Sequence, residues 1–172
     1  KELLESNVVK LDKNNKIRDF FYNRIIFPIA NEYGRIVGFG GRVLDNSNPK
    51  YINSPESDFF KKRNILYNLS DAKQNIRSKK NMLICEGYMD VISLHDKNIK
   101  TAVAPLGTSL TDSHLLLSWK YVNKPTLMFD GDSSGLKASF KSAIMSLPYL
   151  TPSKLLQFII LPNEYDLSLI HI

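Results

Sequence analysis

The 172-residue sequence predicts an α/β protein: a parallel sheet flanked by helices, preceded by a smaller, basic α+β subdomain. Two observations predict the sheet. Between residues 82 and 161, short apolar runs alternate with helical patterns, an order typical of parallel sheets covered by helices. Three of these runs are followed closely by acidic residues. A third observation, the basic charge of residues 1–77, predicts the separate subdomain.

The smaller subdomain is predicted to span residues 1–77. Residues 1–16 are polar and mixed, and they predict a short helix and a loop. Ile25–Ile29 predicts a strand, and the turn residues at 31–34 lead into a returning strand at 35–44. The returning strand contains three glycines, Gly38, Gly40 and Gly41. Glycine is favoured where the backbone passes close to another backbone or to a ligand, so we expect such a neighbour here.

Cations and aromatic rings adjoin one another later in this part. Residues 45–55 are rich in asparagine, serine and proline and predict a loop, within which Lys50 adjoins Tyr51. The sequence Lys61-Lys62-Arg63 follows two phenylalanines. Residues 1–77 hold 14 basic and 9 acidic residues, a net charge of +5, whereas residues 78–172 hold 9 and 8, a net charge of +1. A basic first part suits contact with a polyanion, although solvated lysines alone also produce this charge.

The second predicted unit begins with a short buried strand, Met82–Cys85, which runs directly into Glu86. Gly87 allows the backbone to turn, and Tyr88–Lys97 predicts a helix. Glu86 therefore lies at the carboxyl end of a strand, where open α/β sheets bind their ligands. Asp90 follows four residues later, so one helical turn brings it back toward the same edge.

The same strand and acid pattern recurs downstream. Thr126–Phe129 predicts a strand that ends in Asp130-Gly131-Asp132, and Ser133 or Ser134 is predicted to cap the next helix. Further apolar runs are expected to form strands within 99–104 and 155–161, with a helix beginning at Thr111 between them. We expect the helix after Asp132 to bury Leu136, Phe140, Ile144 and Leu147.

Parallel strands that end in acids bring those acids to one edge of the sheet. The converging carboxylates are Glu86, Asp90, Asp130, Asp132 and Asp166. Carboxylates held together repel one another unless a cation lies between them, and an all-oxygen set suits Mg²⁺ or Mn²⁺. Such sites serve phosphoryl or nucleotidyl transfer. The alternative is that each acid only begins a helix or ends a strand, positions that favour Asp and Glu.

Composition limits the class of protein further. The content of 43% hydrophobic and 23% charged residues is ordinary for a globular protein, and no apolar run has the length of a membrane span. The single cysteine, Cys85, excludes a disulfide framework and predicts a buried thiol in a cytoplasmic protein. Because the sequence starts at Lys1, we expect a fragment of a longer protein.

Two motifs carry a resemblance to a known family. Glu-Gly-Tyr-Met-Asp at 86–90 and Asp-Gly-Asp at 130–132 resemble the signature motifs of the Toprim domain, which primases, topoisomerases and some nucleases share. Upstream, three segments resemble the core of bacterial replicative DNA primases in order and spacing: Arg24–Ile29, Gly38–Arg42 and Pro49–Pro55. The resemblance covers about residues 17–166. The fold it implies is a Toprim-type sheet.

The resemblance implies the joining of ribonucleoside triphosphates into short RNA primers on a single-stranded DNA template, with two or more Mg²⁺ (or Mn²⁺) ions. It implies that Glu86 acts near the 3′-hydroxyl as metal ligand or general base, and that Asp130 and Asp132 hold the ions, supported by Asp90 and Asp166. It also implies template and triphosphate contacts from Arg24, Arg42, Lys50, Tyr51 and Lys62. A replicative helicase is an implied partner, through a module that this chain does not contain; no membrane partner is expected.

The predicted domains are residues 1–77, a Toprim domain at 78–166 and an atypical tail at 167–172. Similarity stops after Asp166, where the family continues with proline and a second aspartate but this chain has Leu167 and Ser168. We expect a tail foreign to the natural gene, and the missing acid places activity of the fragment in question. Two alternatives to a primase stay open: a Toprim nuclease or topoisomerase fragment, and a basic DNA-binding module without catalysis.

Overall fold

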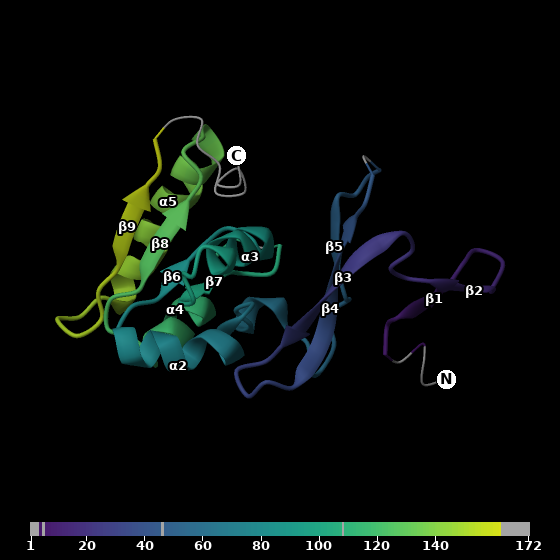
Figure 1. Ribbon diagram of the computed structural model, residues 1–172, viewed down its shortest axis with the longest axis horizontal. Helices are drawn as coiled ribbons and strands as arrows, with labels where there is room; N and C mark the ends of the chain where they lie inside the picture. The colour runs from purple at the N-terminus through teal and green to yellow at the C-terminus, as the bar shows by residue number, and fades with distance from the viewer. Residues whose placement is uncertain (1–3, 5, 46, 108, 163–172) are drawn as a thin grey trace. The chain divides into compact units, whose positions relative to one another are not determined.

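The computed structural model describes residues 4, 6–45, 47–107 and 109–162, and it divides the chain into two compact units (Figure 1). The first comprises residues 1–29 and 36–61, and the second comprises 30–35 and 62–172. Residues 62–77, which we assigned to the smaller subdomain, thus group with the second unit. The reason is that helix α2 (Leu69–Lys79) buries its apolar face in the core of the parallel sheet.

The first unit is built from antiparallel strands. Strands β1 (Val9–Leu11) and β2 (Ile17–Asp19) pair as a ribbon, so Val9–Leu11 form a strand inside the segment for which we expected a short helix and a loop. Most of the residues before Ser6 lie outside the described residues. A second sheet has the order β3-β4-β5. Its strands are β3 (Arg24–Ala30), β4 (Ile36–Val43) and β5 (Tyr51–Asn53). Neighbouring β3 and β4 agree with the predicted hairpin, whereas β5 lies where we expected only a loop.

Glycines in β4 make room for aromatic side chains. A Cβ atom at Gly38 would lie 3.0 Å from the ring of Phe60, and one at Gly41 would lie 2.7 Å from the ring of Phe21. Phe60 is almost fully buried. The close neighbours of these two positions are therefore packed rings of the same unit, where the sequence led us to expect another backbone or a ligand.

The second unit contains the predicted parallel sheet, with strand order β7-β6-β8-β9. Its strands are β6 (Leu83–Ile84), β7 (Ala102–Val103), β8 (Thr126–Phe129) and β9 (Gln157–Ile160). Every neighbouring pair in it is parallel. This confirms the α/β prediction. Figure 1 shows β9 beside β8, with α5 packed along them.

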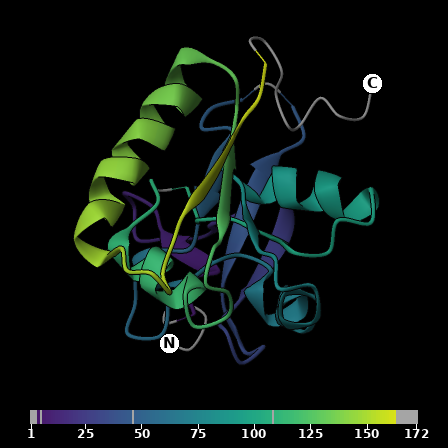
Figure 2. The same ribbon diagram turned by 90° about the vertical axis from the view of Figure 1, so that its left-hand side faces the viewer.

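Helices cover both faces of this sheet. Helix α3 (Tyr88–Asp96) packs Val91 and Leu94 against one face. The other face is covered by α2, α4 (Asp112–Ser118) and α5 (Ser133–Ser146). Successive strand residues alternate between the two cores, as Ile84 and Cys85 do. Figure 2 shows α5 and α3 on opposite sides of the strands. Two short 3₁₀ helices complete the unit, η1 (Lys62–Asn64) and η2 (Leu147–Tyr149).

Helix α5 turns a different face to the sheet than we predicted. Leu136, Phe140, Ile144 and Leu147 are all exposed, Phe140 by 71%. The buried positions are Gly135, Ser142 and Ser146. The two serine hydroxyls donate to helix carbonyls, Ser142 to Ala138 and Ser146 to Ala143, so their burial leaves no polar group unsatisfied. Small residues let the helix lie close to the strands, and that approach decides its orientation.

In the part of the chain that the structure describes, no helix has both the length and the apolar character needed to cross a bilayer.

Candidate active site

The pairing of β6 with β8 brings the first two predicted acids together. Leu83 pairs with Thr126 and Ile84 with Leu127, so the strands end side by side at the same edge of the sheet. Glu86 follows one strand and Asp130 the other. The Oε1 atom of Glu86 accepts a hydrogen bond from the backbone N–H of Asp130, at 3.2 Å. This contact follows from the register of the two parallel strands, which places the residues after their ends side by side.

Asp90 lies against the same strand end from helix α3. Its side chain is buried, 7% exposed, and its Oδ2 atom accepts a hydrogen bond from the backbone N–H of Gly87 at 2.9 Å. Burial raises the pKa of the Cys85 thiol, and the negative charges of Asp90, Asp130 and Glu86 raise it further. The negative charge at this edge of the sheet therefore acts on the buried sulfur. The thiol itself stays protonated and inert.

Asp132 begins helix α5. Its Oδ1 atom accepts a hydrogen bond from the backbone N–H of Gly135 at 2.7 Å, so Asp132 is the N-cap residue. The predicted caps, Ser133 and Ser134, are instead the first residues of the helix. Asp132 is exposed, and the carboxylate can serve the cap and a ligand together because it has two oxygens.

Two glycines shape the turn that carries Asp130 and Asp132. A Cβ atom at Gly135 would overlap the carbonyl oxygen of Asp130, and one at Gly131 would overlap that of Pro162. The turn is therefore closed tightly by backbone on both sides. Pro162, at the exit of β9, lies directly beside it. The fifth predicted ligand, Asp166, lies outside the described residues.

These positions bear on both interpretations of the acids. Asp90 and Asp132 do cap helix starts, as the simpler alternative requires. Among the residues that the structure describes, no three His, Cys, Asp or Glu side chains form a group that could hold a metal ion. Mg²⁺, however, needs only one or two protein carboxylates, completed by water and substrate phosphate. Glu86, whose carboxylate contacts the backbone N–H of Asp130, and the exposed Asp132 two residues further on provide carboxylates of this kind at the same edge.

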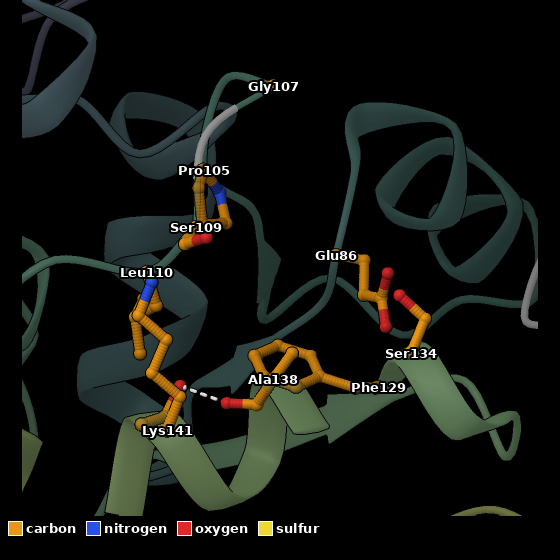
Figure 3. Close-up of a pocket in the computed structure, with 10 residues that line it drawn as sticks. Glu86, Pro105, Gly107, Ser109, Leu110, Phe129, Ser134, Ala138 and Lys141 are labelled. Atoms are coloured by element: carbon orange, nitrogen blue, oxygen red, sulfur yellow. Dashed lines mark hydrogen bonds between the residues drawn. The ribbon is translucent and has the colours of Figure 1, made fainter. Parts of the chain in front are cut away.

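A pocket of about 290 Å³ opens beside Glu86 (Figure 3). Figure 3 shows the Glu86 carboxylate and the Ser134 hydroxyl pointing toward one another, with Lys141 farther along α5. The opposite wall is formed by the loop after β7, through Pro105, Gly107, Ser109 and Leu110. Sequence analysis predicted no site residue in this loop. A loop that follows a parallel strand leads to the same edge as the acids, and that was the available signal.

Most of the predicted nucleic-acid contacts lie in the first unit. The guanidinium of Arg24 donates to backbone carbonyls of Gly41, Pro49 and Lys50, at 3.4, 2.9 and 3.4 Å. Arg24 therefore holds the loop before β5. Arg42 and Lys50 flank the ring of Tyr51, at 5.8 and 5.7 Å from its centroid. These two cations also line a cavity of about 380 Å³.

Lys62 lies in η1, in the second unit, and a buried histidine holds its backbone. His114 is fully buried, and its Nε2 atom lies 2.9 Å from the carbonyl oxygen of Lys62. Its Nδ1 atom accepts a hydrogen bond from the backbone N–H of Thr111 at 3.2 Å, so the proton is on Nε2 and the imidazole is neutral. Sequence analysis gave this histidine no role, because Lys62, the partner of its Nε2 atom, lies 52 residues away in the chain.

The neutral state of His114 predicts an acid-dependent stability. Burial lowers its pKa from the usual 6.5 and outweighs the carbonyls of Lys62 and Ile65 and the charge of Asp112, which raise it; Arg63 lowers it further. Below pH 6.5 the unfolded chain gains a proton that the folded chain does not. The free energy of unfolding should therefore hold steady above pH 6.5 and fall by up to about 1.4 kcal/mol per pH unit below it. Urea unfolding at pH 7.5, 6.5 and 5.5 measures this.

The control is His114→Gln, which cannot titrate. We expect the difference between wild type and variant to shrink as the pH falls from 6.5 to 5.5. Parallel pH profiles for the two proteins would contradict the assignment of a neutral imidazole.

Comparison with known proteins places both units in one family. Residues 1–73 match the model of the DNA primase catalytic core, N-terminal domain, and residues 80–153 match that of the Toprim domain. The DNA primase of Buchnera aphidicola is 46% identical over 165 residues, which cover 96% of this chain and 29% of that protein. The DNA primase of Escherichia coli is 40% identical over 95% of this chain and 28% of its own length.

Solved structures agree with this match. The E. coli primase catalytic core superimposes with a TM-score of 0.90 at 40% identity, covering 96% of this chain and 53% of that one. A DnaG primase catalytic domain bound to single-stranded DNA superimposes with a TM-score of 0.89 at 40% identity, covering 96% and 54%. The chain spans less than a third of the length of its curated relatives. It belongs to the bacterial DNA primase family, and it carries that family's N-terminal core domain followed by its Toprim domain.

Proposed function

We propose that this chain carries the catalytic acids and part of the template-binding surface of an enzyme that joins ribonucleotides into short RNA primers on single-stranded DNA. The reaction class is metal-dependent nucleotidyl transfer. The observation that carries the proposal is the meeting of Glu86 with the start of the Asp130–Asp132 turn, at the carboxyl edge of two neighbouring parallel strands. Ligands of open α/β sheets bind at this edge.

Each acid has a proposed role. Asp130 and Asp132 would hold two or more Mg²⁺ or Mn²⁺ ions. Glu86 would act as a further ligand or as the base near the 3′-hydroxyl. Asp90 and Asp166 are proposed to support them; Asp90 does so by fixing Gly87. When bound, the ions neutralise phosphate charge and favour ionisation of the attacking hydroxyl. The pocket beside Glu86 offers space for a substrate group next to these acids.

Basic side chains are proposed to contact the template and the incoming ribonucleoside triphosphate: Arg42, Lys50, Tyr51 and Lys62, with Arg24 acting through the loop that it holds. The Lys50–Tyr51 pair combines a phosphate partner with a ring on which a base can stack. The match to a primase domain bound to single-stranded DNA supports this assignment. The proposed setting is the bacterial cytoplasm, in cooperation with a replicative helicase.

The match of residues 1–73 to the primase N-terminal domain separates this chain from Toprim nucleases and topoisomerases. The remaining alternative is a DNA-binding module without catalysis. It predicts DNA binding but no response of the acidic edge to Mg²⁺.

Binding of a labelled single-stranded oligonucleotide should weaken linearly as log[salt] rises, because phosphate contacts release counterions. Replacing both Lys62 and Arg63 by alanine should lower the slope of log K by about 0.7 for each lost contact. Fluorescence anisotropy measures both effects. The titrations are run between about 50 and 200 mM salt, because affinities that depend on phosphate contacts change strongly over this range.

A matched control removes the same charge elsewhere in the second unit. Lys97 and Lys100 are exposed at and beyond the end of α3, so the Lys97→Ala, Lys100→Ala variant should keep the wild-type slope. A flat salt dependence in wild type would refute a nucleic-acid function for the chain. Equal slopes in all three proteins would remove Lys62 and Arg63 from the binding surface.

A further inference from the structure

The backbone of the basic turn η1 is held by two side chains from the segment that follows β7, the buried His114 and the partly exposed Thr111. His114 contacts the carbonyl oxygen of Lys62, and the Thr111 hydroxyl donates to the carbonyl oxygen of Arg63 at 2.8 Å. Two residues at the start of α4 thus bind the consecutive carbonyl oxygens of Lys62 and Arg63. Ser118 donates to the His114 carbonyl at 2.8 Å and ties that start to the end of α4.

The same segment borders the pocket beside Glu86. Pro105, Gly107, Ser109 and Leu110 line that pocket, and Thr111 follows immediately in the chain. Residues 105–114 therefore have the acidic pocket at one end and the basic turn at the other. A second set of contacts lies at the start of this segment, where Tyr67 and Ala104 form a β-bridge and the Asn68 amide donates to the Ala102 carbonyl.

We propose that His114 is the positioning residue of the basic turn, holding Lys62 and Arg63 in place beside the loop that lines the Glu86 pocket. The proposal rests on the proposed function, since it gives the turn a purpose only if Lys62 and Arg63 contact a phosphate backbone. His114 itself touches neither substrate nor ion in this assignment.

Burial makes the imidazole the strongest of the available anchors. The ion pair between Arg63 and Asp112 spans 3.8 Å, and its side chains are 66% and 41% exposed, so solvent and salt screen it. The imidazole is excluded from solvent, and its hydrogen bond to Lys62 cannot be replaced by water without opening the core. At high salt, therefore, this hydrogen bond persists while the exposed ion pair weakens.

Two amide variants separate the hydrogen bond to Thr111 from the hydrogen bond to Lys62. In His114→Asn the amide oxygen takes the place of Nδ1, but no donor reaches the Lys62 carbonyl. In His114→Gln the amide nitrogen takes the place of Nε2 and retains that donor. We expect His114→Asn to bind single-stranded DNA about tenfold more weakly, since ordering a freed backbone residue costs a factor of this order. His114→Gln should stay within about twofold of wild type.

A double-mutant cycle distinguishes a positioning residue from one that only stabilises the fold. It compares the effect of His114→Asn on DNA affinity in the presence and in the absence of the Lys62 and Arg63 side chains. In the Lys62→Ala, Arg63→Ala background, His114→Asn should cause no further loss of DNA affinity, because the side chains that it positions are gone. Equal affinities of the asparagine and glutamine variants, or an undiminished loss in that background, would overturn the proposal. An unchanged affinity of Lys62→Ala, Arg63→Ala would also overturn the proposal, because the turn would then lie outside the DNA-binding surface. A flat salt dependence of DNA binding in wild type would instead count against the proposed function.

If His114→Asn does not fold, Thr111 offers a second route to the same turn. Thr111→Val removes both the donor to the Arg63 carbonyl and the acceptor that caps α4 through the His114 N–H, and Thr111→Ser keeps both as the matched control. The proposal is supported if Thr111→Val weakens DNA binding and Thr111→Ser does not. In the Lys62→Ala, Arg63→Ala background, Thr111→Val should then cause no further loss of affinity. Equal binding of the two Thr111 variants overturns it.

Discussion

Replacement of Asp130 or Asp132 by asparagine is expected to abolish primer synthesis while leaving DNA binding intact. Asparagine keeps the size of the side chain but loses the charge that holds a divalent ion. At Asp132 the substitution also keeps the helix cap, because asparagine caps as well as aspartate does, so the bond to Gly135 survives. A loss of synthesis can then be assigned to the site rather than to the fold.

The measurement is primer synthesis on single-stranded DNA with ribonucleotides and Mg²⁺. Since the chain spans 29% of the Buchnera primase, it is best tested in place of the corresponding residues of that protein. Asp96→Asn is the control, because Asp96 is an exposed acid at the end of α3 that forms an ion pair with Lys97. Synthesis above about a tenth of wild type in either site variant would contradict the assignment, since loss of a metal ligand costs more.

Whether wild type or Glu86→Gln has the higher melting temperature should depend on Mg²⁺. Without the ion, the variant should melt higher than wild type, because a neutral side chain relieves repulsion from Asp90 and Asp130. The amide oxygen can still accept the bond from the Asp130 N–H. With several millimolar MgCl₂, wild type should gain more, by about 1.4 kcal/mol if the concentration is ten times Kd.

Melting curves of both proteins, each with and without MgCl₂, test this expectation on the 172-residue chain itself. Asp96→Asn should show the same Mg²⁺ shift as wild type. Equal shifts in wild type and Glu86→Gln would mean that Glu86 is not a metal ligand. A large loss of stability in the metal-free variant would make Glu86 a structural residue of the strand end and favour the binding-module alternative.

The sequence was sufficient for the parallel sheet and for the meeting of its first acids. Short apolar strands separated by helices leave few arrangements other than a covered parallel sheet, and parallel strands end at one edge. The position of Glu86 beside Asp130 therefore follows from local patterns. The family motifs at 86–90 and 130–132 add to that inference, and the matches to primases confirm the family that these motifs indicate.

Helix α5 illustrates what local patterns could not decide. Its apolar residues and its small residues each recur with helical period, so the sequence offers two faces that could pack on the sheet. We chose the apolar face, and the structure buries the small one through Gly135, Ser142 and Ser146. Hydrophobicity identifies a helix face whose burial is favourable. How closely the helix can approach the strands depends instead on the shapes of the helix and sheet surfaces, which the sequence pattern does not describe.

Only the tertiary structure gave His114 and Asp132 their local roles. The partners of His114 are backbone groups of Thr111 and of Lys62, and no spacing rule connects residues 62 and 114. For Asp132, the sequence marked an acid at a helix start but could not tell a cap from a ligand. The structure shows the cap and leaves the carboxylate exposed to serve as both, because each oxygen can take a separate partner.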